Sequence, residues 1–173
     1  MAQKVVNMKQ AFGIEGEFYD SSLKRATNHK LAAAAKYGKP LFLSADGKSV
    51  TPTYNSTTAK TFAGFMVNPK EAINGGGLAA TMEVAAGKYV GVADVGRVIV
   101  KVANAVKVGD KAYLCTKAGT GTGTNYSVGD ICGGTAAPSA SEAAGGVFVE
   151  LTGASFNIVE AAAGELAVIE LNK

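Results

Sequence analysis

The chain has few side chains that could carry out catalysis, and it contains a single histidine, His29. A catalytic triad built on His29 would have to use Asp20 and a nearby serine, Ser21 or Ser22. Such a triad also needs a rigid scaffold to hold the nucleophile. The segment that carries these residues is basic and lacks regular periodicity. We therefore expect His29 to be a surface or capping residue, and we expect no enzymatic activity.

Metal and phosphate sites have equally little support in the sequence. A zinc site needs three or four nitrogen or sulfur ligands, whereas His29, Cys115 and Cys132 supply at most three, at separations that fit no zinc motif. The acidic residues are scattered and form no calcium-type cluster. The Gly-Thr run at 119–124 lacks the Gly-Lys-Ser/Thr ending of a P-loop. We expect no catalytic, metal-binding or cofactor-binding residue.

The composition favours a small β protein whose surface is partly covered by partners. Of 173 residues, 47% are hydrophobic and 18% charged, and 22 are glycine; a charged share of about 25% is usual for a soluble domain. No apolar run approaches the roughly 20 residues that cross a bilayer, so we expect no membrane partner. The N-terminus lacks an apolar signal core, which predicts synthesis in a reducing cytoplasm, with both cysteines reduced and buried.

Charge is unevenly distributed along the chain. Residues 1–70 hold ten Lys or Arg and four Asp or Glu, a net charge of +6, whereas residues 71–173 hold seven and ten, a net charge of −3. This asymmetry is consistent with an acidic partner surface facing the N-terminal part, or with scattered solvated lysines. Glu15, Glu17 and Asp20 lie among the aromatic residues of that part and would repel a phosphate backbone, which argues against a nucleic-acid partner.

Residues 1–27 are predicted to form an extended N-terminal arm. Glycines there allow sharp turns or close backbone approach. Large apolar side chains also occur there without a long element to support them. They either fill the core of this protein or dock on a neighbouring subunit. The candidate interface residues are Phe12, Gly13, Ile14, Gly16, Phe18, Tyr19 and Arg25.

Residues 28–173 are predicted to form a mostly β domain, a small barrel or sandwich with at most one short helix. A helix over 28–40, capped by Asn28 and ended by Gly38, is one interpretation; an extended segment with a turn at Gly38 is the other. Long loops are expected near 68–82, 117–126 and 133–146. The expected strands are 41–43, 61–67, 88–93 and 97–102 as a hairpin around Asp94-Val95-Gly96, 111–115, 147–151, and 156–160 and 165–171 as a second hairpin.

The order of several motifs resembles a known family. The arm motif from Gly13 to Asp20 is similar to the N-terminal Gly-x-x-Gly-acid signature of the structural cement, or capsid decoration, proteins of tailed phages. Two features depart from that pattern, a long 44–82 segment and a helix-like run of alanines at 31–35. The stretches that follow the arm motif in the same order are Tyr37-Gly38, Leu41–Leu43, Tyr89–Gly91, Val106–Tyr113 and Gly164–Leu171.

The resemblance implies a structural protein of the virion that coats the capsid shell, on its outer surface, and uses no cofactor. Its implied partners are the phage major capsid protein and further copies of itself, for example in a trimer. Such a protein stabilises the shell by binding the assembled state and bridging shell subunits. Another virion component, of the tail tube or the head-tail connector, is an alternative, and so is a small β-barrel ligand-binding module.

Overall fold

The computed structural model describes residues 13–21, 23–68, 82–123, 126–139, 141 and 143–172. Within these ranges the chain forms strands and no helix, which confirms the predicted mostly β fold. No helix in the described part is long and apolar enough to span a bilayer. The strands are β1 Arg25–Leu31, β2 Ala35–Lys36, β3 Pro40–Leu43, β4 Ser49–Thr51, β5 Phe62–Met66, β6 Glu83–Val84, β7 Tyr89–Lys101, β8 Asp110–Lys117, β9 Ile131–Gly134, β10 Val147–Phe156 and β11 Leu166–Asn172.

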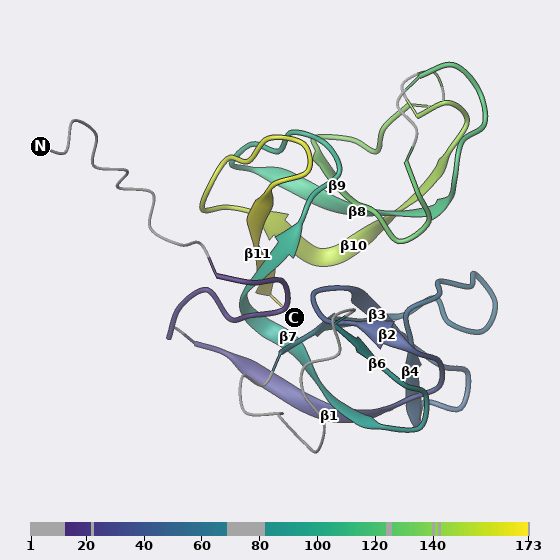
Figure 1. Ribbon diagram of the computed structural model, residues 1–173, viewed down its shortest axis with the longest axis vertical. Helices are drawn as coiled ribbons and strands as arrows, with labels where there is room; N and C mark the ends of the chain where they lie inside the picture. Colours follow the sequence, from purple (N-terminus) through teal and green to yellow (C-terminus); the bar gives the residue numbers. More distant parts are fainter. Residues whose placement is uncertain are drawn as a thin grey trace, which may run out of the picture.

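Two lobes share the long strand β7, which runs through both of them (Figure 1). In the first lobe the sheet order β1-β4-β3-β5-β7 closes on itself, because β1 also pairs with β7, and this makes a five-stranded barrel. In the second lobe the sheet continues from β7 through β11, β10, β8 and β9. A bridge between Val102 and Ile131 brings β9 back to the end of β7. The small pair β2–β6 lies apart from this sheet.

The segment 28–40 is extended, as the second interpretation held, and the helical one is wrong. β1 and β2 occupy residues 28–31 and 35–36 of it, and Gly38 lies in the turn before β3 with a φ of 75°. The alanines at 31–35 therefore do not form a helix, since strand pairing of Leu31 and Ala35 overrides their local preference. The loop predicted near 68–82 lies, from 69 to 81, outside the described residues.

The predicted hairpin around Asp94-Val95-Gly96 is instead one continuous strand of 13 residues, β7. Its first part pairs with β1 and β5, and its second part pairs with β11 from Val95 to Lys101. The three residues are thus the passage from one lobe to the other. The sequence signal was misleading because Asp94 binds Arg25 from β1 and does not cap a turn.

The predicted last hairpin, 156–160 with 165–171, is also different. β10 extends to Phe156, and its final residues pair with β11, Ala154 with Leu171 and Ser155 with Glu170. Residues 157–165 connect the two strands. Pairing with β8 on the other edge of β10 keeps residues 147–156 in one strand.

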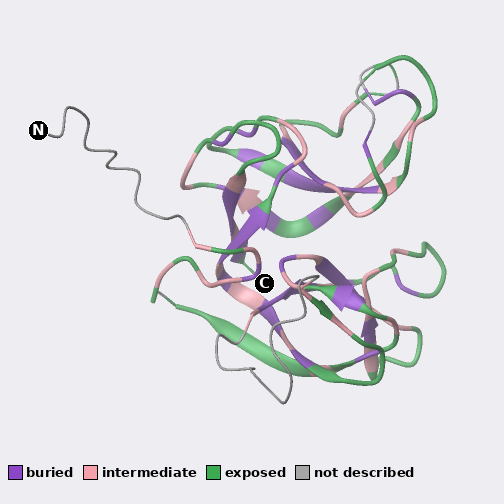
Figure 2. Ribbon diagram, viewed as in Figure 1, coloured by how far each residue is buried: buried purple, intermediate pink, exposed green. Residues whose placement is uncertain are grey.

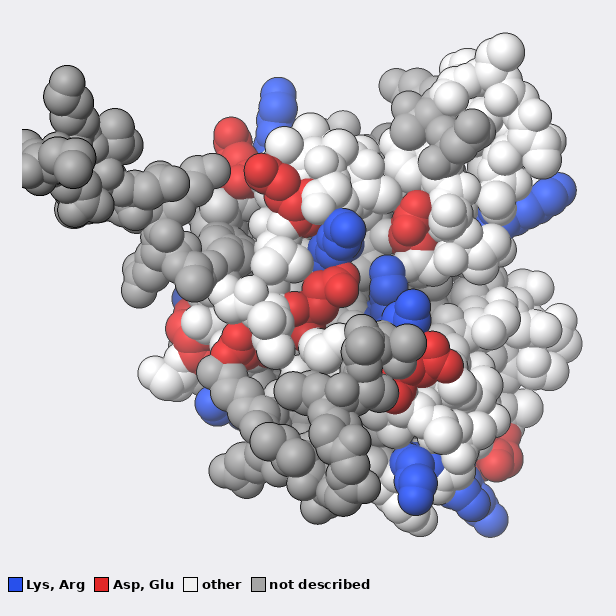
Figure 3. Space-filling view, viewed as in Figure 1, with Lys and Arg blue, Asp and Glu red and all other residues white. Residues whose placement is uncertain are grey.

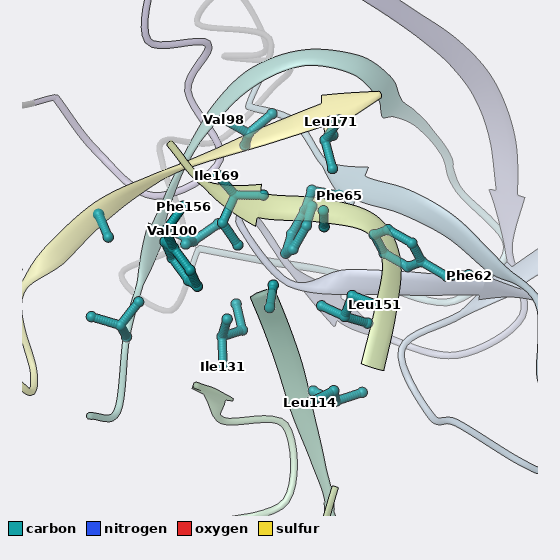
Figure 4. Close-up of a cluster of buried hydrophobic side chains, with 14 of the residues drawn as sticks. Phe62, Phe65, Val98, Val100, Leu114, Ile131, Leu151, Phe156, Ile169 and Leu171 are labelled. Atoms are coloured by element: carbon teal, nitrogen blue, oxygen red, sulfur yellow. The ribbon is translucent and has the colours of Figure 1, made fainter. Parts of the chain in front are cut away.

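The interiors of both lobes are buried (Figure 2). The largest core cluster joins the lobes: side chains from β5, β7, β8, β10 and β11 point toward one another in it (Figure 4). A second cluster fills the first barrel. Leu41 belongs to that barrel cluster and Phe42 to the joint one, because consecutive strand residues face opposite sides. Each lobe therefore packs on the other through side chains that face out of the first barrel.

Candidate functional site

The arm motif forms a tight turn at residues 14–17. The Glu17 N–H donates to the Ile14 carbonyl at 3.1 Å, and the Ile14 N–H donates to the Glu17 carboxylate at 3.2 Å. Gly16 has a φ of 81°, a conformation that favours glycine. The Ile14 carbonyl and the Glu17 carboxylate thus each accept a hydrogen bond that closes the turn. The turn therefore explains why a glycine followed by an acidic residue occurs at positions 16 and 17.

In the described ranges the same turn occurs three more times, at 107–110, 127–130 and 162–165. In each, an acidic side chain accepts from the N–H three residues earlier, at 2.8, 2.8 and 3.2 Å, and its own N–H donates to the carbonyl of that residue. A glycine with φ between 82° and 96° precedes each acidic residue. The arm motif is therefore a local copy of a turn that the domain uses elsewhere before its strands.

Gly16 ties this turn to the barrel by its backbone. Its N–H donates to the Ile99 carbonyl on β7, and its carbonyl accepts from the Asn68 N–H after β5, both at 2.8 Å. A Cβ on Gly16 would lie 2.7 Å from the nitrogen of Gly38 and 2.9 Å from the carbonyl oxygen of Met66. Two motifs of the family resemblance, at 13–20 and 37–38, thus touch each other.

The arm then follows β7. The Ile99 N–H donates to the Glu17 carbonyl at 2.9 Å, the Tyr19 N–H donates to the Arg97 carbonyl at 2.8 Å, and Phe18 lies between them in a bridge to Val98. Phe18 is half-buried against the joint core cluster. The described part of the predicted arm is therefore bound to its own domain.

The arm covers Ile99, a residue on β7 whose side chain would otherwise face outward. Ile99 alternates with Val98 and Val100, which point into the joint core, yet it is buried as well. A Cβ on Gly13 would lie 2.6 Å from the Ile99 Cδ1 atom, so glycine allows the arm to lie close to this side chain. Gly13, Gly16 and Phe18 thus serve the attachment of the arm.

Ion pairs fix the end of the arm. Arg97 on β7 donates to the Asp20 carboxylate at 2.8 Å and lies 3.6 Å from a carboxylate oxygen of Glu170 on β11. Arg25 donates from two nitrogens to Asp94 at 2.8 and 2.9 Å. The hydrogen bonds with Asp20 and Asp94 are the main reason that the pKa values of Arg97 and Arg25 are raised. Both arginines join the arm and β1 to β7.

Other side chains of the arm remain at the surface. The exposed fractions of Ile14, Tyr19 and Leu23 are 46%, 40% and 83%. Leu23 borders a surface hollow of about 210 Å³ beside β7 and β11. We call these three residues, with Arg25, the arm patch. Leu23 was not among the predicted interface residues, although it is a large apolar residue in the otherwise polar stretch 20–25.

Phe12 lies outside the described residues, and so does Ser22. His29 lies on β1, and its Nε2 atom is 3.0 Å from the Thr27 hydroxyl. No group of three or more His, Cys, Asp or Glu in the described ranges could hold a metal ion. Basic and acidic side chains are interspersed over the face in Figure 3, so no large patch of one sign covers that face.

A second hollow, of about 370 Å³, lies between the lobes. Its walls include Pro40 and Tyr54 from the first lobe and Leu114 from the second. Lys39 crosses it, and its Nζ atom donates to the Gly129 carbonyl at 3.2 Å. The hydrogen bond from Lys39 to Gly129 therefore joins the two lobes at the wall of this hollow.

Comparisons with known proteins gave matches to a family model and to solved structures. A family model described as Structural cement protein (E217 gp24/Pam3 gp6) matches residues 2–172. A chain in a structure described as the capsid of Myoviridae Phage XM1 superposes with a TM-score of 0.62 at 15% identity, over 99% of this chain and 98% of that chain. No curated protein matches the sequence. At this identity the structural likeness concerns the fold.

Proposed function

The chain belongs to the structural cement protein family of phages, and on that premise we propose that it binds the outer surface of an assembled head shell and bridges neighbouring shell subunits. A capsid-stabilising structural role and a place in the virion come with the family. The proposed contact residues rest on the geometry of the arm, whereas the outer surface and the bridging rest on the resemblance to capsid decoration proteins.

Binding of this kind stabilises the shell by linkage. A protein that binds the assembled state and not the free subunits shifts the equilibrium toward assembly. Rupture of the shell then requires its contacts to break as well. Because many copies occupy one lattice, a modest affinity at each site is enough. No catalytic step is needed, and we propose none.

The arm patch is the observation that carries the proposed contact. Ile14, Tyr19 and Leu23 are exposed although backbone hydrogen bonds and Phe18 hold their segment against β7. A segment that is ordered before binding loses little conformational entropy on binding. Tyrosine and arginine side chains are also the kinds that contribute strongly at interfaces. Of the predicted interface residues, Ile14, Tyr19 and Arg25 are therefore proposed to touch the shell, and Gly13, Gly16 and Phe18 to present them.

The test uses undecorated shells of the phage that encodes this chain. The double variant Tyr19→Ala with Leu23→Ala should bind these shells about 30-fold more weakly than wild type, since two interface anchors are removed. The matched control is Val108→Ala, an exposed apolar residue in a turn of the other lobe (56% exposed). Melting temperature and circular dichroism of each variant show whether the fold is intact.

Two results would count against the proposal. If wild-type protein does not bind the shells, the capsid role itself is wrong for this chain. If the arm variant binds as well as the Val108→Ala control, the shell contact lies elsewhere. Cryo-electron microscopy of decorated shells would show the surface and the copy number, and mass photometry of free protein would test for a trimer.

A further inference from the structure

The first barrel has one strand edge that lacks a neighbour. β1 pairs with β7 along Arg25–Lys30, but it pairs with β4 at Lys30 and Leu31 alone. Within the described residues, no strand lies along the other edge of 25–29. Figure 2 shows most of β1 as exposed at the rim of the first lobe.

Hydrogen bonds at the end of β1 establish which backbone groups face each edge. The Leu31 N–H donates to the Lys88 carbonyl, in the chain leading to β7, at 2.8 Å. The next residue points the other way, since the Ala32 N–H donates to the Val50 carbonyl on β4, also at 2.8 Å. Backbone groups of alternate strand residues face opposite edges. Odd-numbered residues of β1 therefore face β7, and even-numbered residues face the β4 side.

The same alternation applies to the part of β1 that β4 does not reach. Thr27 and His29 pair with β7 in the register that leads to Leu31, with no shift between them. Ala26 and Asn28 consequently direct their N–H and carbonyl groups to the open edge, and both residues are exposed. The open edge thus offers two donors and two acceptors at the spacing of a β ladder.

We propose that the open edge of β1, at Ala26 and Asn28, accepts an extended acidic segment of the shell subunit as an additional strand. Strand addition at an exposed sheet edge is a general mode of peptide recognition, in which main-chain hydrogen bonds supply affinity. This inference rests on the proposed function and names a second contact for it, separate from the arm patch.

Charge around the edge selects an acidic segment. Lys24 and Lys30 are exposed at the two ends of the open stretch, and Lys88 is exposed beside Leu31 on the β7 side of β1. Asp94, the acidic residue on the neighbouring part of β7, is already bound by Arg25. The remaining charged residue of β1, Lys30, and the residue before the strand, Lys24, are both basic, and carboxylates on an incoming strand would complement them.

This charge also argues against the N-terminal residues of a second copy as the source of the strand. Residues 1–12 carry two lysines and no acidic residue. Like charges placed close together disfavour an interface. The partner already proposed, the shell subunit, can supply an acidic strand from a different sequence.

The variants Ala26→Pro and Asn28→Pro test the edge directly. Proline removes an N–H that faces the open edge and leaves the ladder with β7 intact, as tolerated on edge strands. Each should weaken shell binding about five- to tenfold, as expected for one lost hydrogen bond. Asn28→Ala is the matched control because it keeps the N–H, and its binding should change less than about twofold. Proline variants that bind like this control would overturn the inference.

Hydrogen exchange of the wild-type protein gives a second test that does not depend on the folding of a variant. The amides of Ala26 and Asn28 should exchange rapidly in the free protein and at least about tenfold more slowly on shells. The amides of Thr27 and His29 should be slow in both states. Unchanged exchange at Ala26 and Asn28 on shells that bind the protein would refute strand addition while leaving the proposed function intact.

Two further outcomes identify the wrong partner. Protection of Ala26 and Asn28 in concentrated protein without shells would mean that a second copy occupies the edge. Stronger shell binding by a Lys30→Glu, Lys88→Glu variant would mean that the incoming strand is basic, whereas an acidic strand requires weaker binding. Failure of wild-type protein to bind shells at all would refute the proposed function itself.

Discussion

Substitution of Gly16 by alanine should destabilise the protein far more than the same substitution at Gly164. The two glycines occupy the same position of the same turn, with φ of 81° and 82°. At Gly164 an added Cβ would meet no atom within 4 Å, whereas at Gly16 it would lie 2.7 Å from the Gly38 nitrogen and 2.9 Å from the Met66 oxygen. The pair therefore separates steric crowding from backbone strain.

The magnitudes follow from these two contributions. Both variants place alanine in a left-handed conformation, which costs about 1–2 kcal/mol. Crowding against backbone atoms adds about 1–3 kcal/mol in Gly16→Ala alone, because neither neighbour is a flexible side chain. For a chain of this length each kcal/mol corresponds to about 2–4 °C, so Gly16→Ala should melt about 2–12 °C below Gly164→Ala.

Urea denaturation and calorimetry of both variants measure this difference. The protein could also respond to Gly16→Ala by releasing the turn, and hydrogen exchange detects that response. The Ile99 and Asn68 amides, which donate to Glu17 and Gly16, should then exchange faster than in Gly164→Ala. Equal unfolding free energies, together with equal exchange at these two amides, would show that Gly16 is not held between β5 and β7 as described.

Two other predictions concern charge and protonation. Asp20→Asn should lower the free energy of unfolding by less than about 1 kcal/mol, since the Asp20 and Arg97 side chains are about a third exposed, and it should speed hydrogen exchange of the Tyr19 amide. The control is Glu150→Gln, which removes a more exposed pair with Lys111. Equal exchange of the Tyr19 amide in both variants would contradict an attachment of the arm by Asp20. Burial raises the pKa of the Cys132 thiol from 9.0 to about 12, so the neutral thiol stabilises the folded state below about pH 9, and this contribution is lost as the pH rises toward 12. Iodoacetamide at pH 8 should label Cys132 in denaturant and not in the native protein. Labelling of Cys132 in the native protein would contradict its burial.

The fold class was predictable because short apolar segments alternate with glycine turns. Val98, Val100 and Val102 illustrate this, since they alternate with other residues along the predicted strand 97–102 and all three enter the joint core. The continuity of β7 was not predictable, because Asp-Val-Gly is a common turn sequence, and the strand continues through its pairing with the distant strands β1 and β11 and through the Arg25–Asp94 ion pair. Interactions between distant residues thus decided what local sequence left open.

The candidate site was predictable in part for the same reason. The glycines and aromatic residues of the arm were identified from their types, but their division into buried and exposed members depends on β7. Gly16 and Gly38 are 22 positions apart, and nothing in their local sequence indicates that their backbones touch. The open edge of β1 was hidden as well, because Arg25–Leu31 shows no alternation of apolar and polar residues.

The sharing of β7 between the lobes has a mechanical consequence. A shell under internal pressure would pull on this protein through the arm and β1, which are both attached to β7. That strand continues into the second lobe, where seven residues pair with β11. Tension parallel to a strand loads many ladder bonds at once in shear, whereas tension across a strand opens them one at a time. Pulling from Tyr19 toward residues of the second lobe should therefore require a larger rupture force than pulling across the sheet from β1 to β3.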